Sequence, residues 1–500
     1  MKNYKWIALL LALIMIVGTF AACGTTPSDP KESDNNQSTE TKQGGEGESD
    51  SAKETKEAPK LPSKKYDTVL KVLHWTVDES WIPWEEICLP DWTGDAMDDA
   101  IYARTAELDE KYGIALENEY LRTDQITTSV TNMIMTEEDD YQMIVQRGYQ
   151  FQFLMTTDSF ADISALPYVD TTKSYWNQDS IDTFTFGGTT LFAASDMLLL
   201  DKGATAAVIF NTSIAHDHGW GGSYFYDLVN DKEWTLAKMV EVAADAYDDA
   251  DGDSKTSAGD VFGATGGDDP IHFMLNGAGE RFCVNTGDDS FLKYTFEKER
   301  CYDIVMDTLD MLLYEDFYLS ERTVKESIEQ PFINNQVLFD ISRVKQVNAY
   351  RVMDQDYGIL PIPMYDDTQD EYYSEISPHH DSLMAIPHTA VRNDVQAEAI
   401  GVALEAMSYI SSLDVYPVLY DVVISTKGTR DQESKEMLNI IFNNRVYDIG
   451  IIFDFGYFAN TALRMAKTGS SDIVSKYEAV KDQIDTEIKK VVDTLHGIVG

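Results

Sequence analysis

Cysteine is scarce in this sequence. The 500 residues contain four, namely Cys23, Cys88, Cys283 and Cys301. With Cys23 set aside, the other three can form one disulfide at most and leave one thiol over. This excludes the disulfide-rich class of small secreted domains. If one bridge forms, we expect it to join Cys283 and Cys301.

Basic residues are also few. The sequence has 39 lysines and arginines against 86 aspartates and glutamates, which gives a net charge of −47 at pH 7. A field this negative repels the phosphates of nucleic acids and of anionic lipids, so we exclude DNA and RNA as partners. The charge is suited instead to neutral or cationic ligands.

The familiar catalytic motifs are missing too. The sequence contains no P-loop, no nucleophile elbow, no HExxH pattern and no paired Cys–His arrangement. With 86 acidic residues, a glycosidase-like carboxylate pair can always be found, so such a pair carries no information. We therefore predict that the protein is not an enzyme and has no cofactor, apart from a structural Ca²⁺ discussed below. A surface enzyme acting on glycosides, and a sensor or adhesin without a transport role, stay open as alternatives.

Long apolar runs are absent beyond the first 23 residues. The run Trp6–Val17 follows two lysines and is shorter than the roughly 20 residues of a membrane span. With two alanines just before Cys23, residues 1–22 have the features of a secretory signal peptide. The cleavage region resembles the lipobox of bacterial lipoproteins, with Phe20 where leucine is usual. That resemblance implies that Cys23 is lipidated; the alternative is an ordinary signal peptide with an incidental cysteine.

Residues 23–65 almost lack large apolar side chains. The stretch is dominated by Ser, Gly, Glu, Lys and Thr, and such a composition predicts a disordered, flexible tether. A lipid, a polar tether and a folded body describe a protein held at the extracellular face of the cell membrane by its anchor alone. We expect a monomer.

Strand and helix patterns alternate in the remaining part, whose roughly 435 residues suit two or three domains. Strands at 68–75, 114–120 and 141–145 alternate with helices at 96–112 and 123–135, which predicts parallel βαβ units. Further along we expect strands at 206–211, 336–339, 358–361 and 382–387, helices at 235–247 and 395–411, two helices within 298–329, and one long helix over 472–495.

Several short segments resemble one family. These segments follow a lipobox and occur in the order seen in the extracellular solute-binding lipoproteins (family 1, carbohydrate-type) of Gram-positive ABC importers, which they resemble. The resemblance extends from about Val69 to the C-terminus. It rests on residues 93–104 (TGDAMDDAIYAR), 111–114 (KYGI), 208–211 (VIFN), 233–236 (EWTL), 357–363 (YGILPIP) and 430–440 (RDQESKEMLNI).

The resemblance implies a fold and a function. The fold would be α/β, a two-lobe periplasmic-binding-protein-like fold of type II, with the ligand between lobes that close about a hinge. By analogy, the first lobe comprises residues 66–197 and 367–412, and the second 198–366 and 413–500. The function would be capture of a solute, a sugar or oligosaccharide by preference, and its delivery to ABC permease subunits.

Candidate ligand-binding residues follow from the rule that ligands in open α/β sheets bind beyond the carboxyl ends of strands. Sugars need flat apolar faces, which Trp and Tyr supply, and planar hydrogen-bonding groups, which Asp and Arg supply. Some candidates have a competing interpretation: core packing for a tryptophan, a surface or interlobe ion pair for Arg147, and a plug of the second lobe for Trp220, which otherwise suits a lid. Resemblance to sugar-binding members adds Tyr457. The candidates are Trp75, Trp81, Arg147, Tyr149, Trp220, Asp340, Arg343 and Tyr457.

An acidic loop at residues 249–260 (DADGDSKTSAGD) has the ligand spacing of a Ca²⁺ loop. Ser254 stands where such loops have glycine, and the last position is aspartate where they have glutamate. Two interpretations stay open: a weak structural Ca²⁺ site, or a solvated turn between a helix and a strand. The ligands would be Asp249, Asp251, Asp253, Lys255 through its carbonyl, Ser257 and Asp260. The pairs His216/His218 and His379/His380 do not by themselves make the convergent set that zinc needs.

Overall fold

The computed structural model describes residues 57–499, apart from 76–84, 251, 255, 258, 268, 315, 321–328 and 425–431. The predicted signal peptide, Cys23, most of the tether and Trp81 therefore lie outside the described residues. Residues 56–500 form one compact unit. No helix in the described part of the chain combines the length and apolar character that a membrane span requires.

The first sheet is built from the predicted βαβ units. Its strands lie in the order β14 (Leu383–Ala385), β3 (Met143–Gln146), β1 (Thr68–Trp75) and β2 (Ile114–Leu121). β1 is parallel to β2 and β3, whereas β14 joins antiparallel to β3. The α/β alternation predicted for this region is confirmed.

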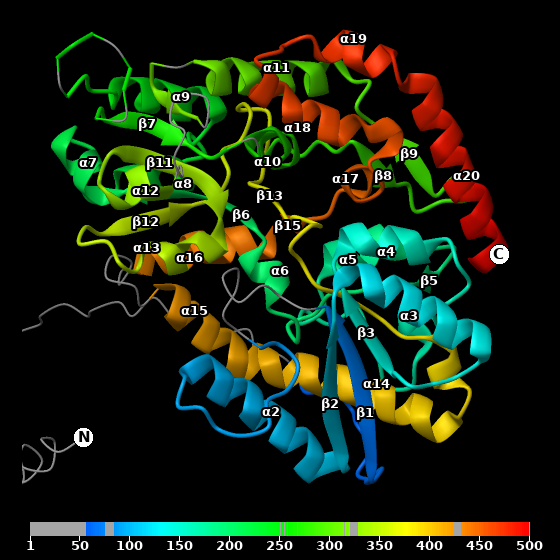
Figure 1. The fold of residues 1–500 in the computed structure, drawn as a ribbon. Helices are drawn as coiled ribbons and strands as arrows, with labels where there is room; N and C mark the ends of the chain where they lie inside the picture. The colour runs from blue at the N-terminus through cyan, green and yellow to red at the C-terminus, as the bar shows by residue number, and fades with distance from the viewer. Residues whose placement is uncertain are drawn as a thin grey trace, which may run out of the picture. The chain divides into compact units, whose positions relative to one another are not determined.

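Helix α2 (Ala96–Tyr112) has the predicted bounds because both ends are specified locally. The Asp95 carboxylate accepts hydrogen bonds from the backbone N–H groups of Met97 and Asp98, which caps the first turn. Gly113 ends the helix with φ +62, a left-handed conformation that glycine adopts without steric cost. α2 then packs beside α14 (Asp394–Ile410) along the first sheet (Figure 1).

The second sheet is mixed. Its order is β10 (Tyr318–Leu319), β7 (Phe262–Thr265), β11 (Val337–Arg343), β6 (Ala206–Asn211) and β12 (Tyr357–Leu360). β11 is parallel to β7 and antiparallel to β6. Helix α9 (Leu236–Asp245) lies so close to β7 that a Cβ on Gly263 would stand 1.8 Å from the Ala243 carbonyl oxygen, so this position requires glycine.

The remaining elements complete the chain (Figure 1). They are α3 (Thr123–Thr136), α4 (Gly148–Met155), η1 (Ile163–Ala165), α5 (Gln178–Phe184), β4 (Thr185–Phe186), β5 (Thr189–Thr190), α6 (Leu200–Gly203), α7 (Thr212–Asp217), α8 (Tyr224–Asn230), α10 (Pro270–Gly277), β8 (Cys283–Asn285), β9 (Leu292–Tyr294), α11 (Glu299–Leu313), α12 (Glu329–Ile333), η2 (Val344–Gln346), α13 (Val347–Tyr350), β13 (Ser374–Glu375), η3 (His388–Val391), the π-helix η4 (Ser411–Val415), α15 (Tyr416–Ile424), α16 (Gln432–Asn443), β15 (Arg445–Val446), α17 (Ile449–Phe453), η5 (Phe455–Tyr457), α18 (Phe458–Thr468), α19 (Ile473–Glu478) and α20 (Lys481–Val499).

Two expectations were wrong. The single helix expected over 472–495 is two helices, α19 and α20, because the chain turns so that Ile484 packs onto η5, close to Gly456. Cys283 and Cys301 do not form a disulfide, and both are free, as is Cys88. The Cys301 thiol lies 3.7 Å from the Thr295 carbonyl oxygen, in a hydrogen bond with that backbone group.

A buried ionic cluster lies where the chain passes between the two sheets. The Asp201 carboxylate contacts Lys202 Nζ at 3.1 Å and Arg445 Nη1 at 2.6 Å, and none of the three side chains is more than 6% exposed. Asp201 and Lys202 lie on α6, between the first sheet and β6, whereas Arg445 lies on β15, which pairs with β13. The ion pair between Asp201 and Arg445 thus joins α6 to β15, two segments that lie far apart in sequence.

The close packing of α14 against the backbone of Pro167 can be tested by substituting Gly401. A Cβ on Gly401 would stand 1.9 Å from the Pro167 carbonyl oxygen, whereas a Cβ on Gly497, in α20, would meet no atom within 4 Å. We expect Gly401→Ala to lower the free energy of unfolding by about 2–3 kcal/mol, because the helix must move away from the backbone. Gly497→Ala should be neutral or stabilising by up to about 1 kcal/mol. Urea unfolding of both variants measures the difference, and equal stabilities would contradict the packing.

Candidate functional site

The segment 376–382 joins the ends of strands from both sheets. On one side, the Val344 N–H donates to the Thr205 carbonyl oxygen at 2.9 Å, and Thr205 forms a β-bridge with Ile376. On the other side, the Tyr149 N–H donates to the Pro378 carbonyl oxygen at 2.8 Å. The segment therefore runs from the carboxyl end of β11 to the carboxyl end of β3.

Arg147 follows β3 at this junction. Its guanidinium donates to the His379 carbonyl oxygen at 2.9 Å and to the Thr123 hydroxyl at 3.0 Å, and it lies 5.0 Å from the centre of the Trp75 ring. Both hydrogen-bond acceptors are neutral. Among the described residues, Arg147 has no ion pair with a carboxylate, either on the surface or between the two sheets.

Tyr149 and Asp381 stand next to Arg147. The Tyr149 ring lies 4.5 Å from the ring of His379. The Asp381 carboxylate accepts the Gly148 N–H at 2.8 Å, while its second oxygen, Oδ2, is buried without a hydrogen-bond partner in the described structure. Burial raises the pKa of Asp381 well above its usual range.

The second sheet contributes residues at and after the end of β11. Arg343 Nη1 contacts Asp269 Oδ2 at 2.8 Å and lies over the Phe273 ring at 5.0 Å. Asp340 accepts a hydrogen bond from the Tyr350 hydroxyl at 2.7 Å, and burial raises the pKa of Asp340 to about 7. Burial and the nearby Arg343 charge lower the pKa of Lys345 to about 8.

His379 lies within electrostatic reach of both sides. Burial lowers the pKa of His379 to about 4, and the charges of Arg343 and Arg147 act in the same direction. The pKa of His380 is lowered by burial and by Arg343 as well. Both imidazoles are therefore neutral at pH 7. Arg147 with Tyr149, after β3, and Arg343, at the end of β11, thus border one segment. Asp340 lies in the middle of β11, and its carboxylate pairs with Tyr350 instead.

The predicted tryptophans and Tyr457 lie elsewhere or are covered. Trp75 is 5% exposed, and the Arg147 guanidinium stands over its ring. Trp220 stacks on His218 at 5.1 Å and packs on the core of the second sheet, in agreement with the plug interpretation. Tyr457 is 48% exposed beside Arg464, 5.3 Å from its guanidinium. Trp81 is outside the described residues.

The sequence analysis missed two residues that the second sheet contributes to the candidate site, Asp269 and His272. Asp269 and His272 follow β7, whose carboxyl end lies at the same edge as that of the parallel strand β11. The strand-end rule that selected Asp340 would have selected them too, had the short strand Phe262–Thr265 been recognised as one. Their only sequence signal is Gly266–Gly267, which ends that strand.

The acidic loop is held by its own backbone. The Asp249 carboxylate accepts N–H hydrogen bonds from Gly252, Asp253 and Ser254, and Asp260 accepts one from Ser257. In the described part of the loop, and elsewhere among described residues, no three acidic, histidine or cysteine side chains gather as metal ligands. Asp251 and Lys255 lie outside that part, so the Ca²⁺ site stays a prediction. A melting temperature equal in calcium and in EDTA would exclude it.

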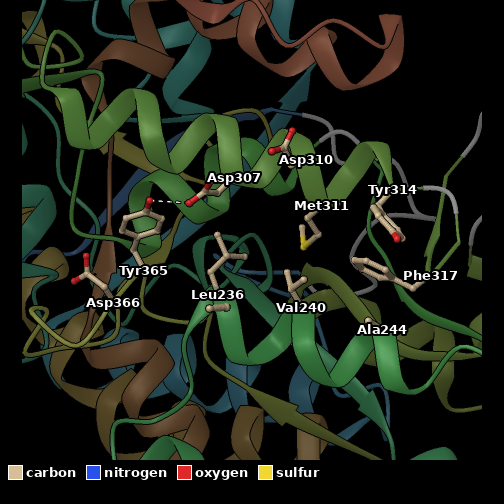
Figure 2. Close-up of a pocket in the computed structure, with 11 residues that line it drawn as sticks. Leu236, Val240, Ala244, Asp307, Asp310, Met311, Tyr314, Phe317, Tyr365 and Asp366 are labelled. Atoms are coloured by element: carbon tan, nitrogen blue, oxygen red, sulfur yellow. Dashed lines mark hydrogen bonds between the residues drawn. The ribbon is translucent and has the colours of Figure 1, made fainter.

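A separate cavity of about 720 Å³ lies between α9 and α11, on the second sheet (Figure 2). Leu236, Val240 and Met311 line its apolar part, and the Tyr365 hydroxyl donates to Asp307 at 2.8 Å on its rim. None of the predicted ligand-binding residues lines it. Acidic groups on the rim of a cavity are weak evidence for a binding site in a chain with 86 aspartates and glutamates. We therefore do not assign the ligand to this cavity.

Comparison with known proteins identifies the fold. The sequence matches no protein-family profile and no curated protein. The structure is similar to the substrate-binding protein Lmo0181 of Listeria monocytogenes in complex with cycloalternan (11% identity, TM-score 0.53, covering 84% of this chain and 99% of that one). It is also similar to UspC of M. tuberculosis (13% identity, TM-score 0.56, covering 84% of this chain and 100% of that one). A third similar structure is a family 1 extracellular solute-binding protein of Bifidobacterium longum subsp. infantis (12% identity, TM-score 0.55, covering 84% of this chain and 99% of that one). The predicted two-lobe, type II α/β fold is confirmed.

Proposed function

We propose that this chain is a lipid-anchored solute-binding protein that captures a sugar or oligosaccharide by lobe closure and delivers it to an ABC permease. The observation that carries the proposal is the meeting of the β3 and β11 ends at residues 376–382, with Arg147 and Tyr149 after β3 and Arg343 at the end of β11. Support comes from the shared fold, because solved structures of that fold hold cycloalternan and maltotetraose.

The side chains at residues 376–382 suit a polyhydroxylated ligand. Tyr149 offers an aromatic face for the C–H side of a sugar ring. The buried, unpartnered oxygens of Asp381 and Glu375 and the remaining N–H groups of Arg147 offer both acceptors and donors for hydroxyls. Each such group gains from a ligand hydroxyl, because a buried polar atom without a partner is costly.

The ligand is tested by calorimetric titration and thermal shift of residues 57–500 with mono- and oligosaccharides, followed by chromatography of the incubated sugars. We expect reversible binding without turnover. Released products would identify a glycoside-active enzyme instead. The absence of any shift with every sugar would exclude carbohydrate capture and favour the sensor or adhesin alternative.

Tyr149 makes a specific prediction for that titration. Tyr149→Ala should weaken sugar affinity about tenfold, because the ligand loses its aromatic face next to His379. Tyr314→Ala serves as the matched control, since that tyrosine is 55% exposed at the rim of the separate cavity. An equal affinity of the two variants would remove Tyr149 from the site.

The anchor rests on Cys23 and needs its own test. We propose lipidation of Cys23 at the extracellular face of the membrane, with the following residues as tether. Expression of the full chain with radiolabelled palmitate should label the wild type and leave Cys23→Ser unlabelled and released into the medium. Retention of the unlabelled variant in the membrane fraction would contradict an anchor made by lipid alone.

A further inference from the structure

The local charge at residues 376–382 is opposite to that of the whole chain. The sequence carries 86 acidic against 39 basic residues, yet the carboxylates here do not balance the cations. Arg343 is paired with Asp269, and these two charges cancel. Asp381 and Glu375 are buried; burial raises the pKa of Glu375 to about 8, so Glu375 is largely neutral at pH 7, and burial raises the pKa of Asp381 as well, which disfavours its charge.

Arg147 forms no ion pair with a carboxylate among the described residues, and its two hydrogen-bond acceptors are neutral. A guanidinium has five N–H donors, and Arg147 uses one of Nη1 on the His379 carbonyl and one of Nη2 on the Thr123 hydroxyl. Its Nε has no acceptor among the described residues, and each Nη keeps one further N–H. The side chain is held in place by these two hydrogen bonds and by the Trp75 ring beneath it.

Held in this way, Arg147 is preorganised for an oxyanion. Arginine and a carboxylate or phosphate form charge-assisted hydrogen bonds that are about twice as strong as neutral ones. A neutral sugar hydroxyl would accept one N–H and leave the half-buried charge of Arg147 unbalanced. The net charge of −47 does not prevent anion binding, because salt screens exposed charges beyond about 8 Å whereas Arg147 acts at contact distance.

We propose that the captured solute is an acidic saccharide, whose carboxylate or phosphate group binds Arg147 while a sugar ring lies against Tyr149. This inference rests on the proposed function and names the chemical class of its ligand. It replaces the expectation, based on the charge of the whole chain, that the ligand is neutral or cationic. The neighbouring His379 and His380, which are neutral, leave Arg147 as the group that selects for charge.

The test compares matched acidic and neutral probes by titration calorimetry at pH 7. Trigalacturonate is paired with its methyl ester, and trehalose 6-phosphate with trehalose, so that the two pairs separate a carboxylate from a phosphate. We expect one acidic probe to bind at least tenfold more tightly than its neutral partner. Raising the salt concentration from 50 to 500 mM should weaken the acidic probe and leave the neutral one unchanged.

Variants of Arg147 assign the preference. Arg147→Gln should weaken the acidic probe 10- to 100-fold and its neutral partner less than threefold, and Arg147→Lys should retain part of the preference. Arg392→Gln, an exposed arginine paired with Glu137, is the control and should bind like the wild type. Unfolding by heat verifies that each variant is folded.

The outcomes separate this inference from the proposed function. Equal affinity for acidic and neutral partners, or an equal loss for both in Arg147→Gln, would overturn the acidic ligand while sugar capture stands. Binding of neutral oligosaccharides alone would do the same. If no saccharide of either kind binds, sugar capture itself is wrong, and the acidic saccharide falls with it.

Discussion

Arg445→Met is expected to lower the free energy of unfolding by about 3–5 kcal/mol. The Arg445 guanidinium contacts Asp201 at 2.6 Å, and Asp201 is fully buried. Without Arg445, the single charge of Lys202 faces both Asp201 and, at 3.8 Å, Asp196. A buried carboxylate without a balancing cation is costly, because it has given up its hydration.

Chemical unfolding in urea measures this loss. Arg392→Met is the matched control, because its guanidinium is 46% exposed and its pair with Glu137 should contribute less than about 1 kcal/mol. A double-mutant cycle with Asp201→Asn should give a coupling of about 1–3 kcal/mol, since the double variant no longer contains the unbalanced charge. A loss below about 1 kcal/mol in Arg445→Met would mean that water reaches Asp201.

The position of this cluster bears on closure of the lobes. Asp201 lies where the chain leaves the first sheet for β6, and Arg445 lies on β15, which pairs with β13 just before the chain returns to β14. A hinge needs crossing segments that keep their mutual contacts while the sheets move. We expect Arg445→Met to change the rate of closure as well as stability.

Local sequence signals predicted those parts of the fold that depend on neighbours in sequence. Helix α2 has the expected bounds because Asp95 and Gly113 specify its ends, and β6 has them because five apolar residues and Asn211 are buried in a row. The break between α19 and α20 escaped prediction because the apolar stripe continues through it. That break depends on contact with η5, which no local pattern encodes.

The candidate site was predictable to the same extent. Asp340 was selected after a strand expected to end at residue 339, but β11 continues to Arg343, so Asp340 lies within the strand. The strand-end rule did find Arg147 and Tyr149, which follow β3, and Arg343, which ends β11. The rule did not predict that segment 376–382 would connect these residues, because Arg147 and His379, which are in contact, lie 232 positions apart in sequence. The charge of the site also required the structure, because burial decides which carboxyl groups are ionised.

Glu375 makes the second large prediction, a loss of stability as the pH rises. Glu375 is 2% exposed on β13, and its Oε2 has no hydrogen-bond partner in the described structure. Burial raises its pKa from 4.5 to about 8, against the opposing charges of Arg343 and Arg281. Because the folded state holds this proton more tightly, the stabilisation is complete below pH 4.5 and is lost as the pH rises towards 8.

Between pH 6.5 and 8 the raised pKa values of Asp381 and, up to about pH 7, of Asp340 lower stability in the same direction, so the Glu375 contribution is the difference between the wild type and Glu375→Gln. His379, whose pKa is lowered to about 4, adds stability only as the pH rises to about 6.5, and Lys345, lowered to about 8, adds stability only above pH 8. Across these 1.5 pH units, at about 1.4 kcal/mol each, Glu375 should contribute a loss of about 2 kcal/mol. Glu375→Gln should reduce the measured loss by that amount, whereas the exposed Glu371→Gln should not. A pH dependence unchanged in Glu375→Gln would show that this carboxyl group is ionised in the folded protein, where the charges of Arg343 and Arg281 favour its ionised form.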